Sequence, residues 1–106
     1  MTAKSSAHHI IIRLITVRGR VQGVGYRAFV VAAARTHGIE GWVRNRRDGS
    51  VEAVIAGSLS AVSVMITECR RGPPAARVEA LDEQPAAATT LGLRPPGEVF
   101  AALATV

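Results

Sequence analysis

Cysteine is nearly absent from this chain of 106 residues, in which Cys69 is the only one. A single cysteine excludes a disulfide within the chain, a CxxC redox pair and a four-cysteine zinc or iron–sulfur site. The three histidines, at positions 8, 9 and 37, have no spacing with acidic residues that would make a metal site. A lone thiol fits a reducing compartment, and Cys69 lies on an apolar helical stripe where we expect it to pack in the core.

Long apolar runs are also missing. Residues 10–17 form an apolar run, but it is interrupted by Arg13 and is too short to cross a bilayer. Residues 1–9 lack the continuous apolar region and the small-residue cleavage site of a secretory signal. We therefore expect a flexible N-terminus over residues 1–9, no membrane association and a cytoplasmic location.

Lysine is scarce, and arginine carries the positive charge. The formal net charge is +5, and Lys4 is the only lysine. A basic protein attracts anions, whether nucleic acids, acidic membrane surfaces or phosphorylated small molecules, and charge alone does not choose among them. The composition is otherwise that of a globular protein, with 48% hydrophobic and 20% charged residues, and the length suits one domain.

The hydrophobic pattern changes between that of strands and that of helices along the chain. Five segments have the alternation or the β-branched content of strands: residues 10–21, 41–46, 51–56, 77–83 and 89–94. Apolar residues at helical spacing, followed by glycine, predict helices over residues 26–37 and 58–71.

The predicted elements follow the order strand, helix, strand, strand, helix, strand. Connections of this kind give a mostly antiparallel sheet with both helices on one face. We therefore predict an α+β fold, the ferredoxin-like α/β sandwich (βαββαβ), over residues 10–94. Residues 95–106 form a tail to which we assign no structure.

The most informative segment is the glycine-bearing loop between the first strand and the first helix, in the run GRVQGVGYR at residues 19–27. At a helix start several backbone N–H groups lack partners, and the helix dipole adds a positive potential. Glycine lets the main chain curl so that these amides approach an anion, and Arg27 can fork onto two phosphoryl oxygens. The loop therefore predicts a phosphate site, but not an ATP or dinucleotide site, because it lacks the GK[ST] ending and the GxGxxG spacing.

Three segments together resemble the acylphosphatase family. The run VRGRVQGVGYR at residues 17–27 is similar to its first signature, and GWVRN at 41–45 with DGSVE at 48–52 is similar to its second. A third run, CRRGPPAARV at residues 69–78, is similar to the exit from the family's second helix. The resemblance implies a cofactor-free hydrolase that splits the carboxyl–phosphate bond of acyl phosphates into a carboxylate and inorganic phosphate.

The resemblance also implies the site residues. Arg27 would bind the substrate phosphate together with the backbone N–H groups of a loop made of Gln22, Gly23, Val24, Gly25, Tyr26 and Arg27. Asn45 would position the attacking water, since a carboxamide accepts one hydrogen bond and donates another. A carboxylate is a good leaving group, so we expect direct attack by water, with no general acid, no phosphoenzyme, no metal and no other cofactor.

The residues around Asn45 and the end of the chain have no predicted part in the reaction. Strand alternation turns Arg44 and Arg46 away from Asn45, onto a solvated face, and Trp42 is expected to pack in the fold. The family typically ends in an aromatic-bearing strand soon after the fourth strand. Residues 89–95 have no aromatic residue, so the packing of this edge strand is unaccounted for.

Other functions share the predicted topology. RNA-recognition domains stack bases on aromatic residues of their central strands. The four aromatic residues here fall mostly elsewhere: Tyr26, Phe29, Trp42 and Phe100. A carbamoyl-transfer domain of hydrogenase maturation would be part of a long protein that carries zinc-binding cysteine clusters, and this sequence has neither feature. The alternative to the enzyme is a non-catalytic module that binds anions or nucleic acid. We expect a monomer that acts on a small-molecule acyl phosphate, with no nucleic acid partner; the sequence does not name the physiological substrate.

Overall fold

A computed structural model describes residues 9–106, so that residues 1–8 of the predicted flexible N-terminus lie outside the described part. The described chain forms eight elements: β1 (Ile11–Arg20), α2 (Tyr26–His37), β2 (Glu40–Asn45), β3 (Val51–Gly57), α3 (Leu59–Arg71), β4 (Arg77–Pro85), the 3₁₀ helix η1 (Ala88–Leu93) and β5 (Phe100–Ala102). The first helix has the predicted bounds, and the first four predicted strands differ from the observed ones by one or two residues at their ends. No helix of residues 9–106 is both long enough and apolar enough to span a membrane.

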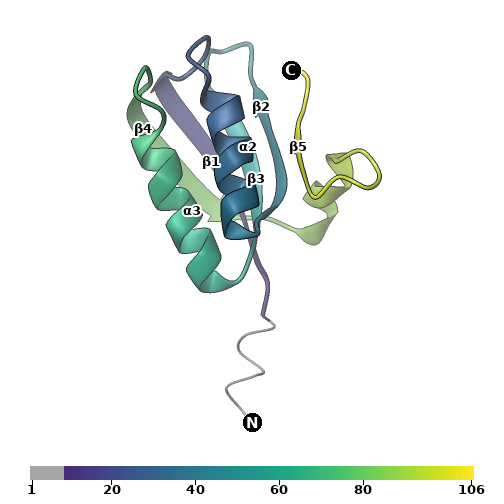
Figure 1. The fold of residues 1–106 in the computed structure, drawn as a ribbon. Helices are drawn as coiled ribbons and strands as arrows, with labels where there is room; N and C mark the ends of the chain where they lie inside the picture. Colours follow the sequence, from purple (N-terminus) through teal and green to yellow (C-terminus); the bar gives the residue numbers. More distant parts are fainter. Residues whose placement is uncertain (1–8) are drawn as a thin grey trace.

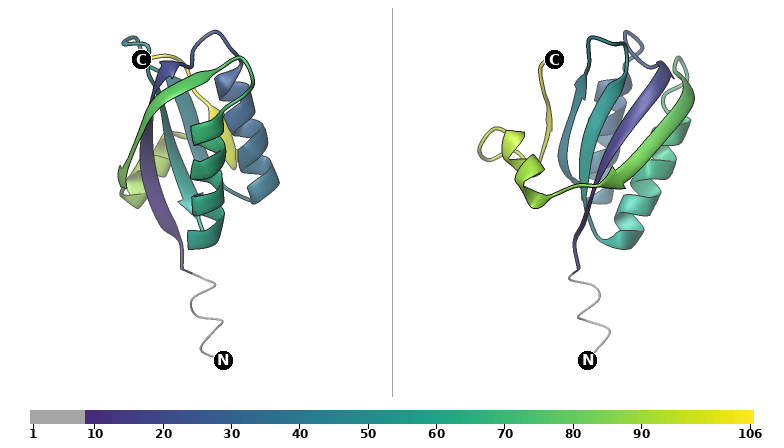
Figure 2. Two further views of the ribbon diagram at one scale, coloured as in Figure 1. Left: turned by 90° about the vertical axis from the view of Figure 1, so that its left-hand side faces the viewer. Right: turned by 180° about the vertical axis from the view of Figure 1, so that it is seen from behind.

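The strands form one sheet in the order β4-β1-β3-β2-β5. β1 pairs antiparallel with β3 and β4, β2 pairs antiparallel with β3, and β5 runs parallel to β2. Helices α2 and α3 lie side by side on one face of the sheet (Figures 1 and 2). The predicted ferredoxin-like sandwich, with its mostly antiparallel sheet and two helices on one face, is confirmed.

This topology brings the C-terminal ends of β1 and β2 together at one border of the sheet, the edge formed by the strand ends. Both strands are antiparallel neighbours of β3, so they run in the same direction. The β1–α2 loop, residues 21–25, therefore emerges at the edge where β2 ends with Asn45. Figure 1 shows this edge at the top, together with the β2–β3 connection and the C-terminus.

The main core lies between the sheet and the two helices. The apolar stripe predicted on α3 is buried and consists of Val62, Met65, Ile66 and Cys69. Cys69 is 0% exposed, so its predicted packing role is confirmed. Burial of a large apolar side chain contributes about 1.5–3 kcal/mol, and this core fixes the sheet edge from which the loop emerges.

The strand predicted at residues 89–94 is wrong, because Ala88–Leu93 form the 3₁₀ helix η1. The reason is a contact with Trp42, which lies on the sheet face opposite α2 and α3. The Trp42 indole N–H donates a hydrogen bond to the Thr90 carbonyl oxygen at 2.8 Å, and Leu91 packs against the cluster that contains Trp42. This tertiary contact overrides the strand preference of the local sequence.

The fifth strand is β5, and it lies in the segment 95–106 to which no structure was assigned. It supplies the aromatic residue that residues 89–95 lack. Phe100 is 4% exposed and belongs to the main core, while Ala101 faces the cluster around Trp42. Trp42 packs in the fold as predicted, and β5 completes the sheet next to β2.

A buried hydroxyl joins the two helices beside the β1–α2 loop. Tyr26, the first residue of α2, donates from its hydroxyl to the Cys69 carbonyl oxygen at 2.6 Å. Burial raises the pKa of Tyr26 far above its ordinary value and raises the pKa of Cys69 to about 12, so both groups keep their protons at neutral pH. This contact holds the start of α2 against the end of α3.

We expect Tyr26→Phe to lower the free energy of unfolding by about 1–2 kcal/mol, because it leaves the Cys69 carbonyl without its buried donor. Chemical denaturation followed by Trp42 fluorescence measures the change. Thr36→Val is the control, since it removes an exposed hydroxyl hydrogen bond from the same helix and should change stability by less than about 0.5 kcal/mol. Equal effects of the two substitutions would contradict the role given to the buried bond.

Stability should also fall at alkaline pH. The Cys69 thiol has an ordinary pKa of 9.0 in the unfolded chain and a pKa of about 12 in the folded one. Below pH 9 neither state loses this proton; above it unfolding releases the proton, and rising pH therefore favours the unfolded state. Denaturation at a series of pH values should give a constant free energy of unfolding up to about pH 9 and then a decline. Cys69→Ala should decline less steeply, and a flat profile in the wild type would refute this account.

Candidate active site

The β1–α2 loop has a backbone that only glycine adopts readily. Gly23 and Gly25 have φ angles of 72° and 79°, in the left-handed region. Gly25 is also the residue that precedes the first turn of α2, and no side chain caps this helix start. The two glycines curl the main chain, as the sequence predicted.

The amides of this loop are free. Within residues 9–106, the backbone N–H groups of residues 22–27 donate no hydrogen bond to the protein, and the first amide of α2 that does is that of Phe29, to the Gly25 carbonyl. The first turn of α2 contains no acidic residue. Free amides at a positive helix end are the donors that an anion site requires, and here they lie at the edge of the sheet.

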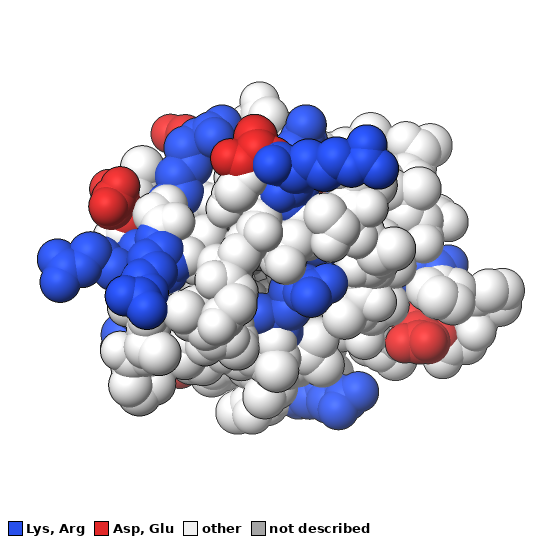
Figure 3. Space-filling view, turned by 90° about the horizontal axis from the view of Figure 1, so that it is seen from above, with Lys and Arg blue, Asp and Glu red and all other residues white. Residues whose placement is uncertain are grey.

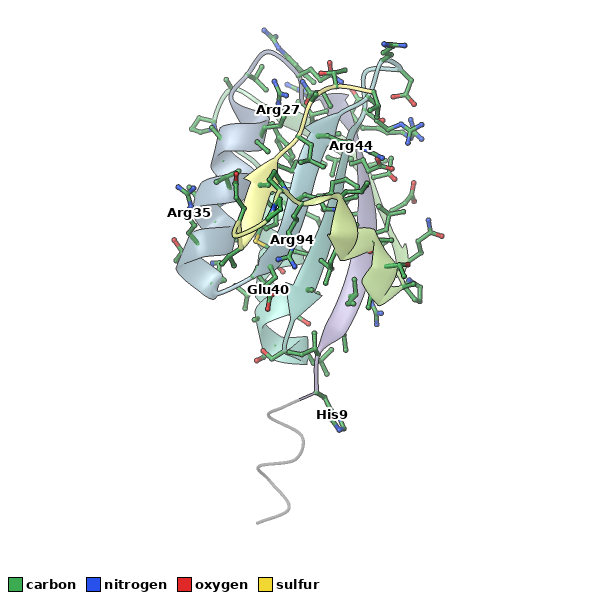
Figure 4. The ribbon with its side chains drawn as sticks, turned by 90° about the vertical axis from the view of Figure 1, so that its right-hand side faces the viewer. His9, Arg27, Arg35, Glu40, Arg44 and Arg94 are labelled. Atoms are coloured by element: carbon green, nitrogen blue, oxygen red, sulfur yellow. The ribbon has the colours of Figure 1, made fainter. Side chains whose placement is uncertain are left out.

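Arg27 and Asn45, predicted from separate signatures, line one cavity of about 210 Å³ together with Val21, Gln22, Gly23, Gly25, Tyr26 and Ala28. Arg27 is half-buried, and it takes no part in the ion pairs formed within residues 9–106. Figure 4 shows Arg27 at the loop end of α2 and Arg35 farther along the same helix. Of the predicted loop residues, Val24 does not line the cavity: its side chain packs against the main core.

Asn45 reaches the cavity because of strand alternation. Val43 of β2 faces the helices and belongs to the main core, so Asn45, two residues later, points to the same side. Its Oδ1 atom is buried and has no hydrogen-bond partner among residues 9–106. A buried carbonyl oxygen without a donor is unfavourable unless a ligand or water donates to it. The cavity is therefore lined by the loop with its free amide donors and by Asn45, whose buried Oδ1 atom lacks a donor within residues 9–106.

Arg44 and Arg46 lie on the other face of the sheet, as alternation predicted. Both bind Glu52 of β3, with distances of 2.7 Å from Arg44 Nε to Oε1 and 3.0 Å from Arg46 Nη1 to Oε2. Arg44 also stacks on the ring of Trp42, 4.7 Å from its centroid. Glu52 is 7% exposed, so these pairs hold the outer face of β2 in place and keep both guanidinium groups away from the cavity.

The edge of the sheet that carries the cavity is rich in arginine. Figure 3 views this edge from above and shows several blue side chains around the hollow, with fewer red ones. The ends of β1, β2, α3 and the start of β4 contribute Arg18, Arg20, Arg46, Arg47, Arg71 and Arg77. Two acids at this edge are paired, Asp48 with Arg18 and Glu68 with Arg71. The resulting positive potential attracts anions to the loop.

The cavity lining has no side chain suited to act as a general acid or base near neutral pH. Its lining residues include no carboxylate, imidazole or thiol, and the Tyr26 hydroxyl is committed to Cys69. Asp48, on the nearby β2–β3 turn, accepts hydrogen bonds from the hydroxyl and amide of Ser50, which lower its pKa, so it stays ionised. No group of three or more metal-ligating side chains gathers anywhere in residues 9–106. The chemistry available is anion binding and water positioning.

The side chain of Gln22 is a feature that sequence reasoning missed. Only the backbone of Gln22 was predicted to matter, yet its Nε2 donates to the carbonyl oxygens of Arg46 at 2.7 Å and Ser50 at 2.8 Å. Both acceptors belong to the β2–β3 turn, more than twenty residues away in sequence. No local pattern signals such a contact, because it depends on the two segments meeting at the same edge of the sheet.

Comparison with known proteins identifies the family of this chain. A family model described as Acylphosphatase matches residues 13–91. An acylphosphatase of Rhodopseudomonas palustris (strain BisB18) is 60% identical over 96 residues, which make up 91% of this chain and 97% of that protein. An acylphosphatase of Nitrobacter winogradskyi is 54% identical over 98 residues, or 92% of this chain and 99% of that one.

A solved structure agrees as well. The crystal structure of acylphosphatase from Bacillus subtilis matches with a TM-score of 0.76 and 30% sequence identity, over 90% of this chain and 99% of that one. The matched family model covers the β1–α2 loop, Asn45 and both helices. On these grounds the chain belongs to the acylphosphatase family.

Proposed function

We infer that this acylphosphatase hydrolyses acyl phosphates at the edge of the sheet, with Arg27 and Asn45 as its catalytic residues. The observation that carries the inference is one cavity that joins free loop amides, an unpaired guanidinium and the unpartnered Asn45 Oδ1. The substrate is a small molecule, R–CO–O–PO₃²⁻, and the products are R–COO⁻ and inorganic phosphate.

The phosphoryl group is held by the loop and by Arg27. The amides of residues 22–27 donate to no protein group within residues 9–106 and are available to the phosphoryl oxygens, and the guanidinium of Arg27, which lines the same cavity, donates to two of them. In a loose phosphoryl-transfer transition state, charge is spread over the three equatorial oxygens, and these donors stabilise it. No metal or other cofactor is needed for this step.

The attacking water is held by Asn45. Its buried Oδ1 accepts a hydrogen bond from the water, which orients a water lone pair towards phosphorus. An aspartate at this position would repel the dianionic substrate, whereas a carboxamide is neutral. Positioning of this kind replaces a bimolecular encounter by a reaction within the complex.

The bond that breaks is the one between phosphorus and the carboxyl oxygen. Water attacks in line, a new P–O bond forms, and the acyl carboxylate leaves with the electron pair. The carboxylate needs no proton, so the absence of an acid from the cavity lining does not hinder it. A phosphoryl oxygen takes the proton that water loses, and no phosphoenzyme forms.

We also propose that the protein acts as a cytoplasmic monomer without a nucleic acid partner. The aromatic side chains of Tyr26, Trp42 and Phe100 are each at most 4% exposed, and Phe29 is partly buried, so they offer no surface on which bases could stack. The alternative, a non-catalytic module that binds anions, would keep the loop and Arg27 but would give no turnover.

Hydrolysis of benzoyl phosphate by the purified protein should continue in the presence of a chelator. Arg27→Ala should raise KM and the inhibition constant for inorganic phosphate and lower kcat/KM by about 10²-fold or more, because the phosphate loses the two hydrogen bonds from the guanidinium.

Asn45→Ala should lower kcat by about 10²–10³-fold, with little change in phosphate inhibition, because the attacking water loses its hydrogen-bond acceptor. Arg35→Ala is the control on the same helix. Absence of turnover in the folded wild type would favour the binding module instead.

The curl of the loop can be tested with two glycines of one helix. Gly25 and Gly38 flank α2 with φ angles of 79° and 66°, and an added Cβ meets no atom within 4 Å at either position. Alanine in the left-handed region costs about 1–2 kcal/mol at both positions, so stability should fall equally. Gly25→Ala should lower kcat/KM about tenfold and weaken phosphate inhibition, because the loop amides move, whereas Gly38→Ala should leave both unchanged. Equal activity of the two variants would exclude a role for loop curvature in binding.

A further inference from the structure

The side chain of Gln22 is the only one from the β1–α2 loop that donates a hydrogen bond to the β2–β3 turn within residues 9–106. Its backbone belongs to the loop that holds the phosphoryl group. Its carboxamide reaches across to the turn that begins immediately after Asn45. The two halves of the proposed reaction, phosphate binding and water positioning, are therefore tied together by this one side chain.

The turn that Gln22 contacts is itself well fixed. The Arg46 amide donates to the Ser50 carbonyl at 2.8 Å, and the Gly49 amide donates to the Arg46 carbonyl at 3.1 Å. Within the turn, Asp48 accepts hydrogen bonds from the amide and hydroxyl of Ser50. Gln22 adds a second donor to each of the two carbonyl oxygens of Arg46 and Ser50. A movement of the loop relative to the end of β2 would break both of its hydrogen bonds.

Gln22 has no amide hydrogen left for the substrate. Its two Nε2 hydrogens are used by the carbonyl oxygens of Arg46 and Ser50. The Nε2 donors of Gln22 can therefore affect the reaction only indirectly, by changing the position of the loop relative to Asn45. This separates Gln22 from Arg27, which lines the cavity and takes part in none of the ion pairs formed within residues 9–106.

We propose that the Gln22 carboxamide is a positioning residue, which sets the spacing between the phosphate loop and the water held by Asn45. The proposal rests on the function inferred above. The loop and Arg27 can still bind phosphate without the tether, but the water and the phosphorus atom lose their alignment. An error of about 1 Å in such an alignment can lower the rate about 10²-fold. Loss of the tether should therefore reduce kcat and leave phosphate binding nearly unchanged.

The first test is Gln22→Met, which keeps the length of the side chain and removes both donors. We expect kcat for benzoyl phosphate to fall at least about tenfold, while KM and the inhibition constant for inorganic phosphate change by less than about threefold. Gln84→Met is the matched control, because Gln84 is exposed on β4. The side-chain amide signals of Asn45 in an ¹⁵N–¹H spectrum should shift in Gln22→Met and not in the control. Wild-type kcat in Gln22→Met would overturn the proposal.

A double-mutant cycle separates this proposal from the function on which it rests. In the Asn45→Ala background, Gln22→Met should have little further effect on kcat, because there is no positioned water left to misalign. A tenfold loss in both backgrounds would overturn the proposal, since Gln22 would then act without Asn45. If Asn45→Ala alone keeps wild-type kcat, the proposed role of Asn45 is wrong. The proposed role of Gln22 is then wrong as well, because it depends on Asn45.

Gln22→Glu is a second variant, which keeps the shape of the side chain should methionine disturb folding. The ionised carboxylate faces two carbonyl oxygens and donates to neither, whereas the protonated form donates one hydrogen bond. Its kcat relative to wild type should therefore rise as the pH falls through the carboxyl pKa. A ratio that stays constant over this range would overturn the proposal.

Discussion

Backbone amides without protein partners are the constraint on which this structure depends. An acyl phosphate has a doubly charged phosphoryl group, and the loop at residues 22–27, which we propose binds it, has N–H groups that donate to nothing in the described chain. Such a loop cannot be stabilised from the side that faces the cavity, so it must be held from its other sides. Val24 packs into the core, the Tyr26 hydroxyl bonds to the end of α3, and Gln22 bonds to the β2–β3 turn. The loop is thus fixed in place while its amides remain free.

The alternation of side chains along β2 places the proposed catalytic residue Asn45 and the neighbouring arginines on opposite faces of the sheet. Asn45 shares the helix side of the sheet with Val43, while Arg44 and Arg46 share the other side with Trp42 and are bound by Glu52. Without this separation, two guanidinium groups would lie where, in the proposed mechanism, the neutral carboxamide holds the attacking water. The arginines still add to the positive potential of this edge, which favours the approach of an anionic substrate.

Much of the fold, and the loop with Arg27, could be predicted from local signals in the sequence, whereas Asn45 was predicted from the resemblance to the acylphosphatase family. The bounds of α2 follow from apolar spacing and from Gly38, and the cavity brings together Arg27 and Asn45, which came from two separate segments. The errors arise where a distant contact decides. Residues 88–93 form a 3₁₀ helix because Trp42 binds Thr90, and the aromatic edge strand therefore appears at Phe100. The tether from Gln22 could not be read from the sequence for the same reason: its acceptors are backbone carbonyls of a remote turn.

The residue types that line the cavity also affect which phosphate compounds can react. The cavity lining offers loop amides and Arg27 to a phosphoryl group in the proposed reaction, but it contains no carboxylate, imidazole or thiol that could protonate a leaving oxygen. Asp48 is held ionised by Ser50, and the hydroxyl of Tyr26 is bonded to the Cys69 carbonyl. An alkoxide leaving group requires a proton, whereas a carboxylate does not, so under the proposed mechanism we expect an ordinary phosphate ester to bind in this cavity without being cleaved. Selection for acyl phosphates then follows from the stability of the leaving carboxylate and needs no pocket shaped to one acyl group.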